Sequence, residues 1–310
     1  MAYPVAVEQE QQRKWLTLKR RQWLWAYLFL ALPLVFFLTI RIAPTIYAFY
    51  VSLHKWDPIA ITQPYIGVDN FRRMQSDKVF WQSMQNTWIY VIVGVPVSLV
   101  LSLVVALGLQ RLTRYVGFYR MLYFIPYITS LVAVSWVWRW MYTPNGIFNE
   151  VLGRIGLGPY GFLLDPSMAI YCIIATTVWQ GLGFQIVIFL AGLEGIPDMY
   201  YEAAQLDGAS AWQRFRDVTI PLLNPTIVFL AVIGVINMLQ VFTQVRNMSS
   251  QGRGGPLNST ISIVLYVYQQ AFQNLPSRMG YATAMTFVLF AMILIITIIQ
   301  LKVLSKQYDY

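Results

Sequence analysis

Charged side chains are scarce in this sequence, at 11% of its 310 residues. A soluble domain usually carries about 25%. Hydrophobic residues make up 57% of the chain, so too little polar surface remains to cover them in water. Many of them fall in runs of about 20 residues, the length that a helix needs to cross about 30 Å of hydrocarbon. These proportions exclude an ordinary water-soluble domain and predict an all-α integral membrane protein.

Cysteine and histidine are almost absent, with one residue of each. Cys172 has no second cysteine to pair with, which excludes a disulfide framework. His54 is expected as an exposed ring in an outer loop, and one histidine cannot form a multi-histidine metal site or proton relay. A glycine-rich phosphate loop and a Ser, His and acid set confined to one site are also missing. We therefore expect no catalytic residues, no metal ligands and no cofactor in this chain.

Acidic residues are missing from the long apolar runs, because all 13 of them lie in the segments between or beyond these runs. Ion-driven transporters usually keep Asp or Glu within the bilayer to bind the coupling ion, at a cost of about 3 kcal/mol per charge. The absence of such carboxylates disfavours a stand-alone secondary transporter, which stays open as the weaker alternative.

Six apolar runs are present, and each predicts a membrane-spanning helix. They cover residues 26–46, 87–109, 121–142, 169–193, 226–245 and 282–301. The sequence thus predicts an N-terminal segment over 1–25, a six-span transmembrane domain over 26–301 and a tail over 302–310. An even number of spans places both termini on the same side of the membrane.

Lys and Arg are about twice as dense on one side of the predicted spans as on the other. The richer side comprises segments 1–25, 110–120, 194–225 and 302–310. Basic segments next to spans stay in the cytoplasm, so both termini are predicted to be cytoplasmic.

The loop 194–225, between the fourth and fifth spans, departs from this basic trend with five acidic residues against two arginines. Its pattern predicts a short helix over 198–206 and a left-handed turn at Gly208. Ser210 is expected to cap a second helix that ends before Pro221. Small residues at the corner would let another protein approach closely. A pair of helices lying on lipid is the alternative interpretation.

The same loop contains a recognisable motif. Its residues are Glu202-Ala203-Ala204, Asp207-Gly208-Ala209, Ile220-Pro221 and Pro225. They resemble the EAA signature of the transmembrane subunits of bacterial binding-protein-dependent ABC importers, except that Ile220 precedes the proline where many members have Leu. The six spans and outer loops are similar to the sugar-type permeases of the maltose and glycerol-phosphate importer class over most of residues 20–305.

The resemblance implies that the loop forms a coupling helix in a cleft of a separate ATPase subunit. The implied coupling residues are Glu202, Ala203, Ala204, Asp207, Gly208 and Ala209. It also implies a second homologous permease, two copies of a cytoplasmic ABC ATPase that binds ATP and Mg, and an extracytoplasmic solute-binding protein. The implied location is the bacterial inner membrane, and the implied mechanism is alternating access.

Amide side chains in two spans indicate a candidate substrate path, because polar groups in hydrocarbon need partners or a cavity. The fifth run has three amides spaced to share one helical face, and the fourth adds an indole and two amides. These residues are Asn237, Gln240, Gln244, Trp179, Gln180 and Gln185. Amides and an indole face suit an uncharged sugar, oligosaccharide or polyol. Hydrogen bonding between helices is the alternative.

Two arginines keep a second substrate class open. Arg41 and Arg139 lie near the predicted outer ends of the first and third spans. Snorkelling to the lipid headgroups beside aromatic residues explains both. The alternative is that they bind a phosphorylated or anionic solute such as glycerol phosphate.

Overall fold

The computed structural model describes residues 5–112, 114–274 and 276–304. Along the chain the helices are α1 (Val5–Phe37), the π-helical η1 (Leu38–Ile42), α2 (Ala43–Ser52), α3 (Asp69–Ser76), α4 (Lys78–Gln110), α5 (Val116–Ile128), α6 (Leu131–Met141), α7 (Ile147–Arg154), α8 (Ala169–Glu194), α9 (Asp198–Leu206), α10 (Ala211–Arg214), the π-helical η2 (Phe215–Thr219), α11 (Ile220–Leu222), α12 (Asn224–Leu239), α13 (Thr243–Met248), α14 (Ile263–Tyr268), the π-helical η3 (Gln269–Gln273) and α15 (Met279–Leu304). The described part of the chain contains isolated β-bridges but no strand.

Among the described residues, four helices are long and apolar enough to cross a membrane, and two sharply bent helix pairs bring the number to six if each pair is one span. The four are Thr17–Ser52, Lys78–Gln110, Ala169–Glu194 and Met279–Leu304. The prediction of an all-α membrane protein is confirmed.

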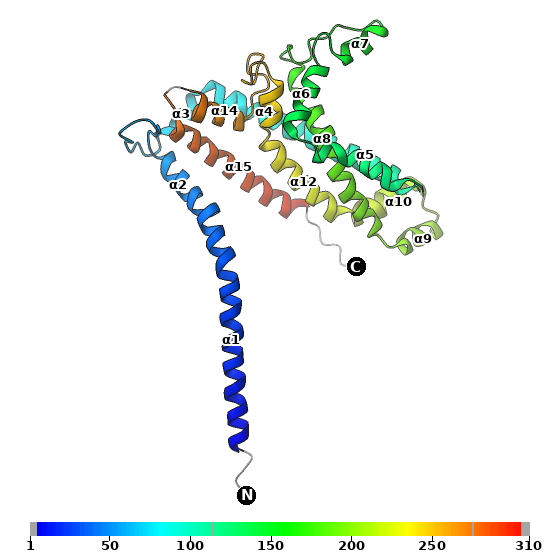
Figure 1. Ribbon diagram of the computed structural model, residues 1–310. Helices are drawn as coiled ribbons and strands as arrows, with labels where there is room; N and C mark the ends of the chain where they lie inside the picture. Colours follow the sequence, from blue (N-terminus) through cyan, green and yellow to red (C-terminus); the bar gives the residue numbers. More distant parts are fainter. Residues whose placement is uncertain (1–4, 113, 275, 305–310) are drawn as a thin grey trace.

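The first span is part of a much longer rod than the sequence predicts. Helix α1, η1 and α2 follow one another without a break and project away from the other helices (Figure 1). No residue of the most apolar stretch of this rod is buried. Near its end, the ring of Phe49 packs against Phe287 of α15, with centroids 5.2 Å apart. The apolar surface of the rod therefore needs lipid or another membrane helix to cover it.

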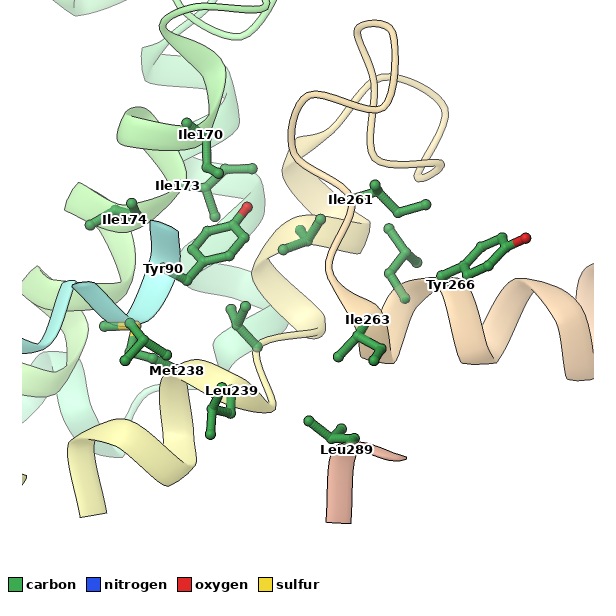
Figure 2. Close-up of a cluster of buried hydrophobic side chains, with 14 of the residues drawn as sticks. Tyr90, Ile170, Ile173, Ile174, Met238, Leu239, Ile261, Ile263, Tyr266 and Leu289 are labelled. Carbon is green, nitrogen blue, oxygen red and sulfur yellow. The ribbon is translucent and has the colours of Figure 1, made fainter. Parts of the chain in front are cut away.

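Helices α4, α8 and α12 form the centre of the bundle. Figure 2 shows Tyr90 of α4 in a cluster with side chains of α8 and α12 and of the segment that follows α13. The cluster includes Ile170, Ile173, Ile174, Met238, Leu239, Ile261 and Ile263. Gly94 lets the Met238 side chain of α12 pack directly on the backbone of α4, because a Cβ on Gly94 would lie 2.8 Å from Cε of Met238. Close backbone approach at small residues is the usual way that helices associate in lipid.

The third predicted span, 121–142, is not one straight helix. It is broken between α5 and α6, whose axes are bent by 95°. Pro126 lies in the last turn of α5, where its ring disfavours regular helix, and Thr129 follows with extended dihedral angles. The carbonyl of Ile125 accepts from both the backbone N–H and the hydroxyl of Thr129, at 3.2 and 2.8 Å, which closes the last turn of α5.

The fifth predicted span, 226–245, also breaks. Helix α12 ends at Leu239, and α13 begins only at Thr243. The carbonyl of Val241, exposed by the break, accepts a hydrogen bond of 2.6 Å from the Ser262 hydroxyl. A continuous helical face from Asn237 to Gln244 was therefore wrong, because the chain leaves the helix between them.

The irregular segment before α14 is tied to α4 by side chains. Asn86 donates to the carbonyls of Asn258 and Ile261 at 2.8 and 3.0 Å. The hydroxyl of Tyr90, one turn further along the helix, donates to the carbonyl of Thr260 at 3.0 Å. Non-helical backbone inside a membrane protein is tolerated where protein groups supply such partners.

His54 is buried, with 6% of its surface exposed, so the expectation of an exposed ring was wrong. Its Nδ1 lies 2.8 Å from the carbonyl oxygen of Tyr50. The amide of Asn70 donates to the carbonyls of Ser52 and His54 at 2.8 and 3.0 Å. The segment that follows α2 therefore folds back on the end of this helix, and this closed cap could not be read from composition.

Asp77 is a junction that the sequence analysis missed. Its carboxylate caps α4 by accepting from the backbone N–H groups of Val79 and Phe80. The hydroxyls of Tyr266 and Tyr281 also donate to it, at 2.6 and 2.7 Å. Burial would raise the pKa of Asp77, but these four hydrogen bonds outweigh it and lower the pKa below the ordinary value of 3.8.

We expect the stability that Asp77 contributes to be complete above its ordinary pKa and to be lost as the pH falls through its lowered pKa in the folded protein. Asp77→Asn should have a lower melting temperature than the wild type near neutral pH, and the difference should shrink below about pH 4. Thermal unfolding in detergent, from neutral pH down to this acidic range, measures the difference in melting temperature. Asp69→Asn is the control, because Asp69 forms only an exposed pair with Arg72. A pH-independent difference would contradict the assignment.

Two glycines on α8 should respond differently to the same change. A Cβ on Gly183 would lie 2.1 Å from the carbonyl oxygen of Tyr123, whereas a Cβ on Gly181 would meet nothing within 4 Å. We expect Gly183→Ala to separate α5 from α8 and cost about 1–3 kcal/mol. Gly181→Ala should be neutral or slightly stabilising, because alanine favours helix. Melting temperatures in detergent compare the two variants, and equal values would refute the close contact.

Candidate functional site

A cavity of about 760 Å³ lies between α4, α5, α8 and the break between α12 and α13. Its polar lining consists of amide and hydroxyl side chains. They are Ser98, Tyr127, Thr129, Thr177, Gln180, Gln185, Asn237, Gln240, Thr243 and Gln244. Among the described residues that line this cavity there is no Asp, Glu, Lys, Arg or His. The cavity can exchange hydrogen bonds with a solute but offers it no charge.

Five of the six predicted path residues line this one cavity, although their helices are separated in sequence. The break after Leu239 brings Gln240 and Gln244 to the cavity together with Asn237. Trp179 is the exception, since its ring packs against Trp138 with centroids 5.2 Å apart. Successive helical residues point in different directions, so Trp179 and Gln180 cannot share a face. The functional role of all six residues stays a prediction.

The hydrogen bonds divide the five amides into two groups. Gln185 bridges α8 and α4, because its Oε1 accepts from Ser102 at 3.0 Å and its Nε2 donates to Ser98 at 3.3 Å. Gln180 donates to the carbonyl of Tyr127 at 3.2 Å. Both therefore serve contacts between helices.

The remaining three amides, those of Asn237, Gln240 and Gln244, make no side-chain hydrogen bond to any described part of the protein. Their donors and acceptors are free to meet whatever occupies the cavity.

The hydroxyl groups of the cavity were missed in the sequence analysis. Ser98 and Thr177 lie inside otherwise apolar runs, and that position was the available signal. Tyr127 and Thr129 come from the break between α5 and α6, which the sequence did not reveal.

Arg139 holds two helices together rather than reaching into the cavity. Its Nη1 donates to the carbonyl of Asn247 in α13 at 3.0 Å, and its guanidinium lies 4.9 Å from the ring centroid of Trp136. Arg41 lies exposed on the long N-terminal rod. Neither arginine is among the residues that line the cavity.

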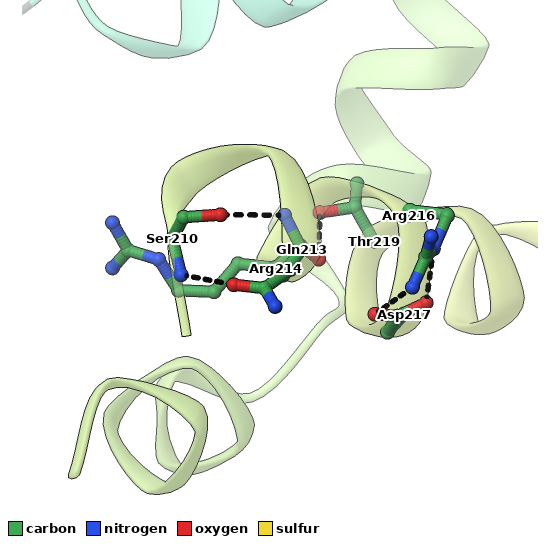
Figure 3. A network of polar contacts seen from close by, with 6 residues as sticks. All are labelled: Ser210, Gln213, Arg214, Arg216, Asp217 and Thr219. Carbon is green, nitrogen blue, oxygen red and sulfur yellow. Dashed lines mark hydrogen bonds and ion pairs between the residues drawn. The ribbon is translucent and has the colours of Figure 1, made fainter. Parts of the chain in front are cut away.

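At the other end of α12 the loop 194–225 forms two short helices that meet at an elbow. Helix α9 has the predicted bounds, and Gly208 takes the left-handed conformation with φ of +76°. Ser210 caps the next helix in a reciprocal pair with Gln213, as Figure 3 shows. The expected end before Pro221 was wrong. The helix continues through the wider π-turn of η2, which relieves the clash that a proline causes in a regular helix.

The elbow presents free carboxylates and apolar side chains on a rigid base. Glu202 and Asp207 form no ion pair with any described residue. Leu206, between them, is 89% exposed. The base is fixed because the hydroxyls of Tyr201 and Thr219 lie 3.1 Å apart and join α9 to η2. All six predicted coupling residues gather at this elbow, and their role stays a prediction.

This fold, with a polar cavity inside a helical bundle and an exposed rigid elbow at one end, defines a membrane transport subunit. Residues 76–306 match the family described as binding-protein-dependent transport system inner membrane component. The chain belongs to this family, whose relatives below are sugar-type ABC transporter permeases, and the predicted family is confirmed.

Relatives match along almost their whole length. The lactose transport system permease protein LacF of Rhizobium radiobacter is 34% identical, over 92% of this chain and 95% of the relative. The sn-glycerol-3-phosphate transport system permease protein UgpA of Agrobacterium fabrum is 29% identical, over 92% of this chain and 96% of the relative. A bacterial alginate ABC transporter, solved in complex with its alginate-bound periplasmic protein, has a chain that matches with 25% identity and a TM-score of 0.78. This match covers 93% of the present chain and 96% of that one.

Proposed function

We propose that this chain forms half of the translocation pathway for a sugar, oligosaccharide or related polyol. The observation that supports this most is the lining of the cavity, in which amides and hydroxyls stand without a charged side chain among the described residues. An uncharged polyhydroxylated solute exchanges hydrogen bonds with such groups and needs no counter-charge.

A phosphorylated or anionic solute is the second candidate. It is favoured by the similarity to the glycerol-phosphate permease and to the alginate transporter. The cavity itself disfavours it, because its lining has no cationic side chain to offset the cost of taking an anion out of water.

The energy for transport comes from separate subunits in this proposal. Two copies of a cytoplasmic ATPase bind ATP and Mg, and this chain has no ATPase site of its own. A second homologous permease completes the pathway, and a solute-binding protein delivers the solute from outside. The elbow and both termini lie in the cytoplasm. The structure of the alginate transporter in complex with its periplasmic protein supports the solute-binding protein as a partner.

The elbow is joined to the cavity by one short path, which bends by 66° between residues Ala211–Leu222 and Asn224–Leu239. Tyr201 joins α9 to η2, and η2 continues through α11 toward α12. Helix α12 ends at Leu239, directly before the cavity-lining Gln240. ATPase closure that shifts the elbow would therefore move the wall of the cavity, as alternating access requires.

The left-handed turn at Gly208 tests the coupling role. A Cβ there has no neighbour within 4 Å, so only backbone strain opposes a side chain. Valine should distort the elbow at a cost of about 1–2 kcal/mol, whereas asparagine tolerates this conformation. We expect Gly208→Val and Glu202→Ala to lower binding-protein-stimulated ATPase activity and transport by about tenfold, and Gly208→Asn to lower them little. Both ATPase activity and transport are measured on the complex reconstituted in proteoliposomes. If Gly208→Val shows the activity and transport of the wild type, the proposed coupling role is contradicted.

The free amides test the substrate path. Gln240→Leu removes a hydrogen-bonding group of the cavity with little change of volume. We expect the KM for the transported saccharide to rise by about two- to tenfold, the worth of one neutral hydrogen bond. Gln110→Leu, at the end of α4 and outside the cavity, is the matched control. The KM is measured from transport kinetics in proteoliposomes. An unchanged KM in Gln240→Leu would show that this residue does not contact the substrate.

A further inference from the structure

The helices that line the cavity are connected to the elbow in different ways. Helix α12 follows the elbow along the chain, and α8 ends at Glu194, shortly before α9 begins. Helix α5 leads to the lining residues Tyr127 and Thr129, but it has no such connection along the chain. A movement of the elbow therefore reaches α5 only through contacts with neighbouring helices.

The half of α5 that is nearest the cavity is held tightly against α8. A Cβ on Gly183 would lie 2.1 Å from the carbonyl oxygen of Tyr123, so the two backbones touch there. The ring of Tyr127 stacks on that of Phe184, with centroids 5.3 Å apart. Gln180 also donates to the carbonyl of Tyr127. These contacts make this half of α5 follow any movement of α8.

The other half of α5, at its start, is held by an ion pair. The helix begins after Tyr115, whose side chain caps no backbone N–H group, and Phe118 in the first turn is 56% exposed. Nη2 of Arg120 donates to Oε1 of Glu194, the last residue of α8. Arg120 has no other ion pair among the described residues, and its buried Nε has no hydrogen-bond partner. The pair with Glu194 is thus the charged contact between the start of α5 and α8.

The last turn of α8 also touches α12. A Cβ on Gly192 would lie 2.5 Å from Oγ1 of Thr226 and 2.8 Å from Cδ1 of Leu223. One turn of α8 therefore contacts α12 through its glycine and α5 through Glu194. It lies directly before the elbow in the chain. Three helices that line the cavity meet at this turn.

Folding stability is a weak reason for the ion pair. The side chains of Arg120 and Glu194 are 40% and 58% exposed. An exposed pair adds little to the free energy of unfolding, because water screens the charges. Its position is more informative, since it joins the start of α5 to the turn of α8 next to the elbow.

We propose that Arg120 is a positioning residue for transport, whose ion pair with Glu194 makes the whole of α5 follow α8 when the ATPase moves the elbow. Tyr127 and Thr129 then move together with Gln240, and this half of the pathway rocks as one body. Without the pair the start of α5 lags behind, and ATP is hydrolysed with less transport. This inference rests on the proposed function and extends coupling to a residue outside the loop 194–225.

The first test replaces the ion pair by neutral side chains. The complete importer, with its partner permease, ATPase and binding protein, is reconstituted in proteoliposomes and supplied with lactose, maltose or trehalose. Transport and ATP hydrolysis are measured together, which gives the number of sugar molecules transported per ATP. The variants are Arg120→Gln, Glu194→Gln and the exchanged pair Arg120→Glu with Glu194→Arg. Arg154→Gln is the matched control, because Arg154 forms an exposed ion pair with Glu150 inside α7.

We expect each single variant of the pair to lower the number of sugar molecules transported per ATP by about two- to fivefold, the range that an exposed ion pair allows. The exchanged pair should recover most of this loss, because the attraction remains with the signs reversed. Arg154→Gln should transport like the wild type. The melting temperatures of Arg120→Gln and Arg154→Gln in detergent should be equal.

The second test replaces the ion pair by a covalent link. Cysteines are introduced as Arg120→Cys and Glu194→Cys in a Cys172→Ser background, which removes the only native cysteine. A short bifunctional thiol reagent that a reductant can cleave joins them. We expect transport per ATP to be low before cross-linking, to return to the wild-type value afterwards and to fall again on reduction. An uncharged link could not replace an arginine that acted by its charge on the ATPase.

Several results would overturn the inference in distinguishable ways. If the wild type transports a sugar and both single variants of the pair transport as much per ATP, the role of Arg120 is refuted while the proposed function stands. A cross-linked variant that stays poorly coupled, or cysteines that the reagent does not join, would also refute it. A melting temperature that falls in Arg120→Gln but not in Arg154→Gln would assign the pair to packing and refute the role. If the wild type transports none of the three probes, the proposed function fails together with it.

Discussion

Hydrocarbon supplies no hydrogen-bond partners, and this constraint decides where the helices of this chain are able to break. At the break after α12, the hydroxyl of Ser262 donates to the carbonyl of Val241, which has lost its backbone partner. At the break after α5, the carbonyl of Ile125 keeps the backbone N–H of Thr129 as its donor and gains the Thr129 hydroxyl as a second one. Both breaks border the cavity, since Thr129 and Val241 are among its lining residues. The polar cavity therefore lies where the helices around it end early and where the protein's own backbone and side chains supply the hydrogen-bond partners at their ends.

The sequence predicted the elements whose causes are local. The bounds of α9, the turn at Gly208 and the cap at Ser210 follow from neighbouring residues, and the structure has all three. Composition and run length gave the membrane fold for the same reason. The continuous fifth span was wrong, because the break after Leu239 depends on Ser262, which lies 21 residues from Val241. The burial of His54 likewise depends on the distant Asn70.

The candidate site was predictable as a set of residue types but not as an arrangement. The amides stood out because they are polar groups in apolar runs. Only the structure separates Gln185, which binds Ser98 and Ser102 between helices, from Gln240, whose amide is free. Residue spacing could not decide this, because the partners come from α4, far away in sequence. Phe242, which also lines the cavity, was missed for the same reason, because its ring packs against Tyr268 of α14, far away in sequence.

The contact of Gly94 with Met238 has a mechanical consequence. The glycine lets α4 and α12 approach closely, and the side chain that fills the gap is an unbranched thioether that also lines the cavity. Methionine adopts many rotamers of similar energy and follows an irregular surface. A side chain of this kind can refill the contact when the spacing of the two helices changes, whereas a branched side chain would fit one spacing only.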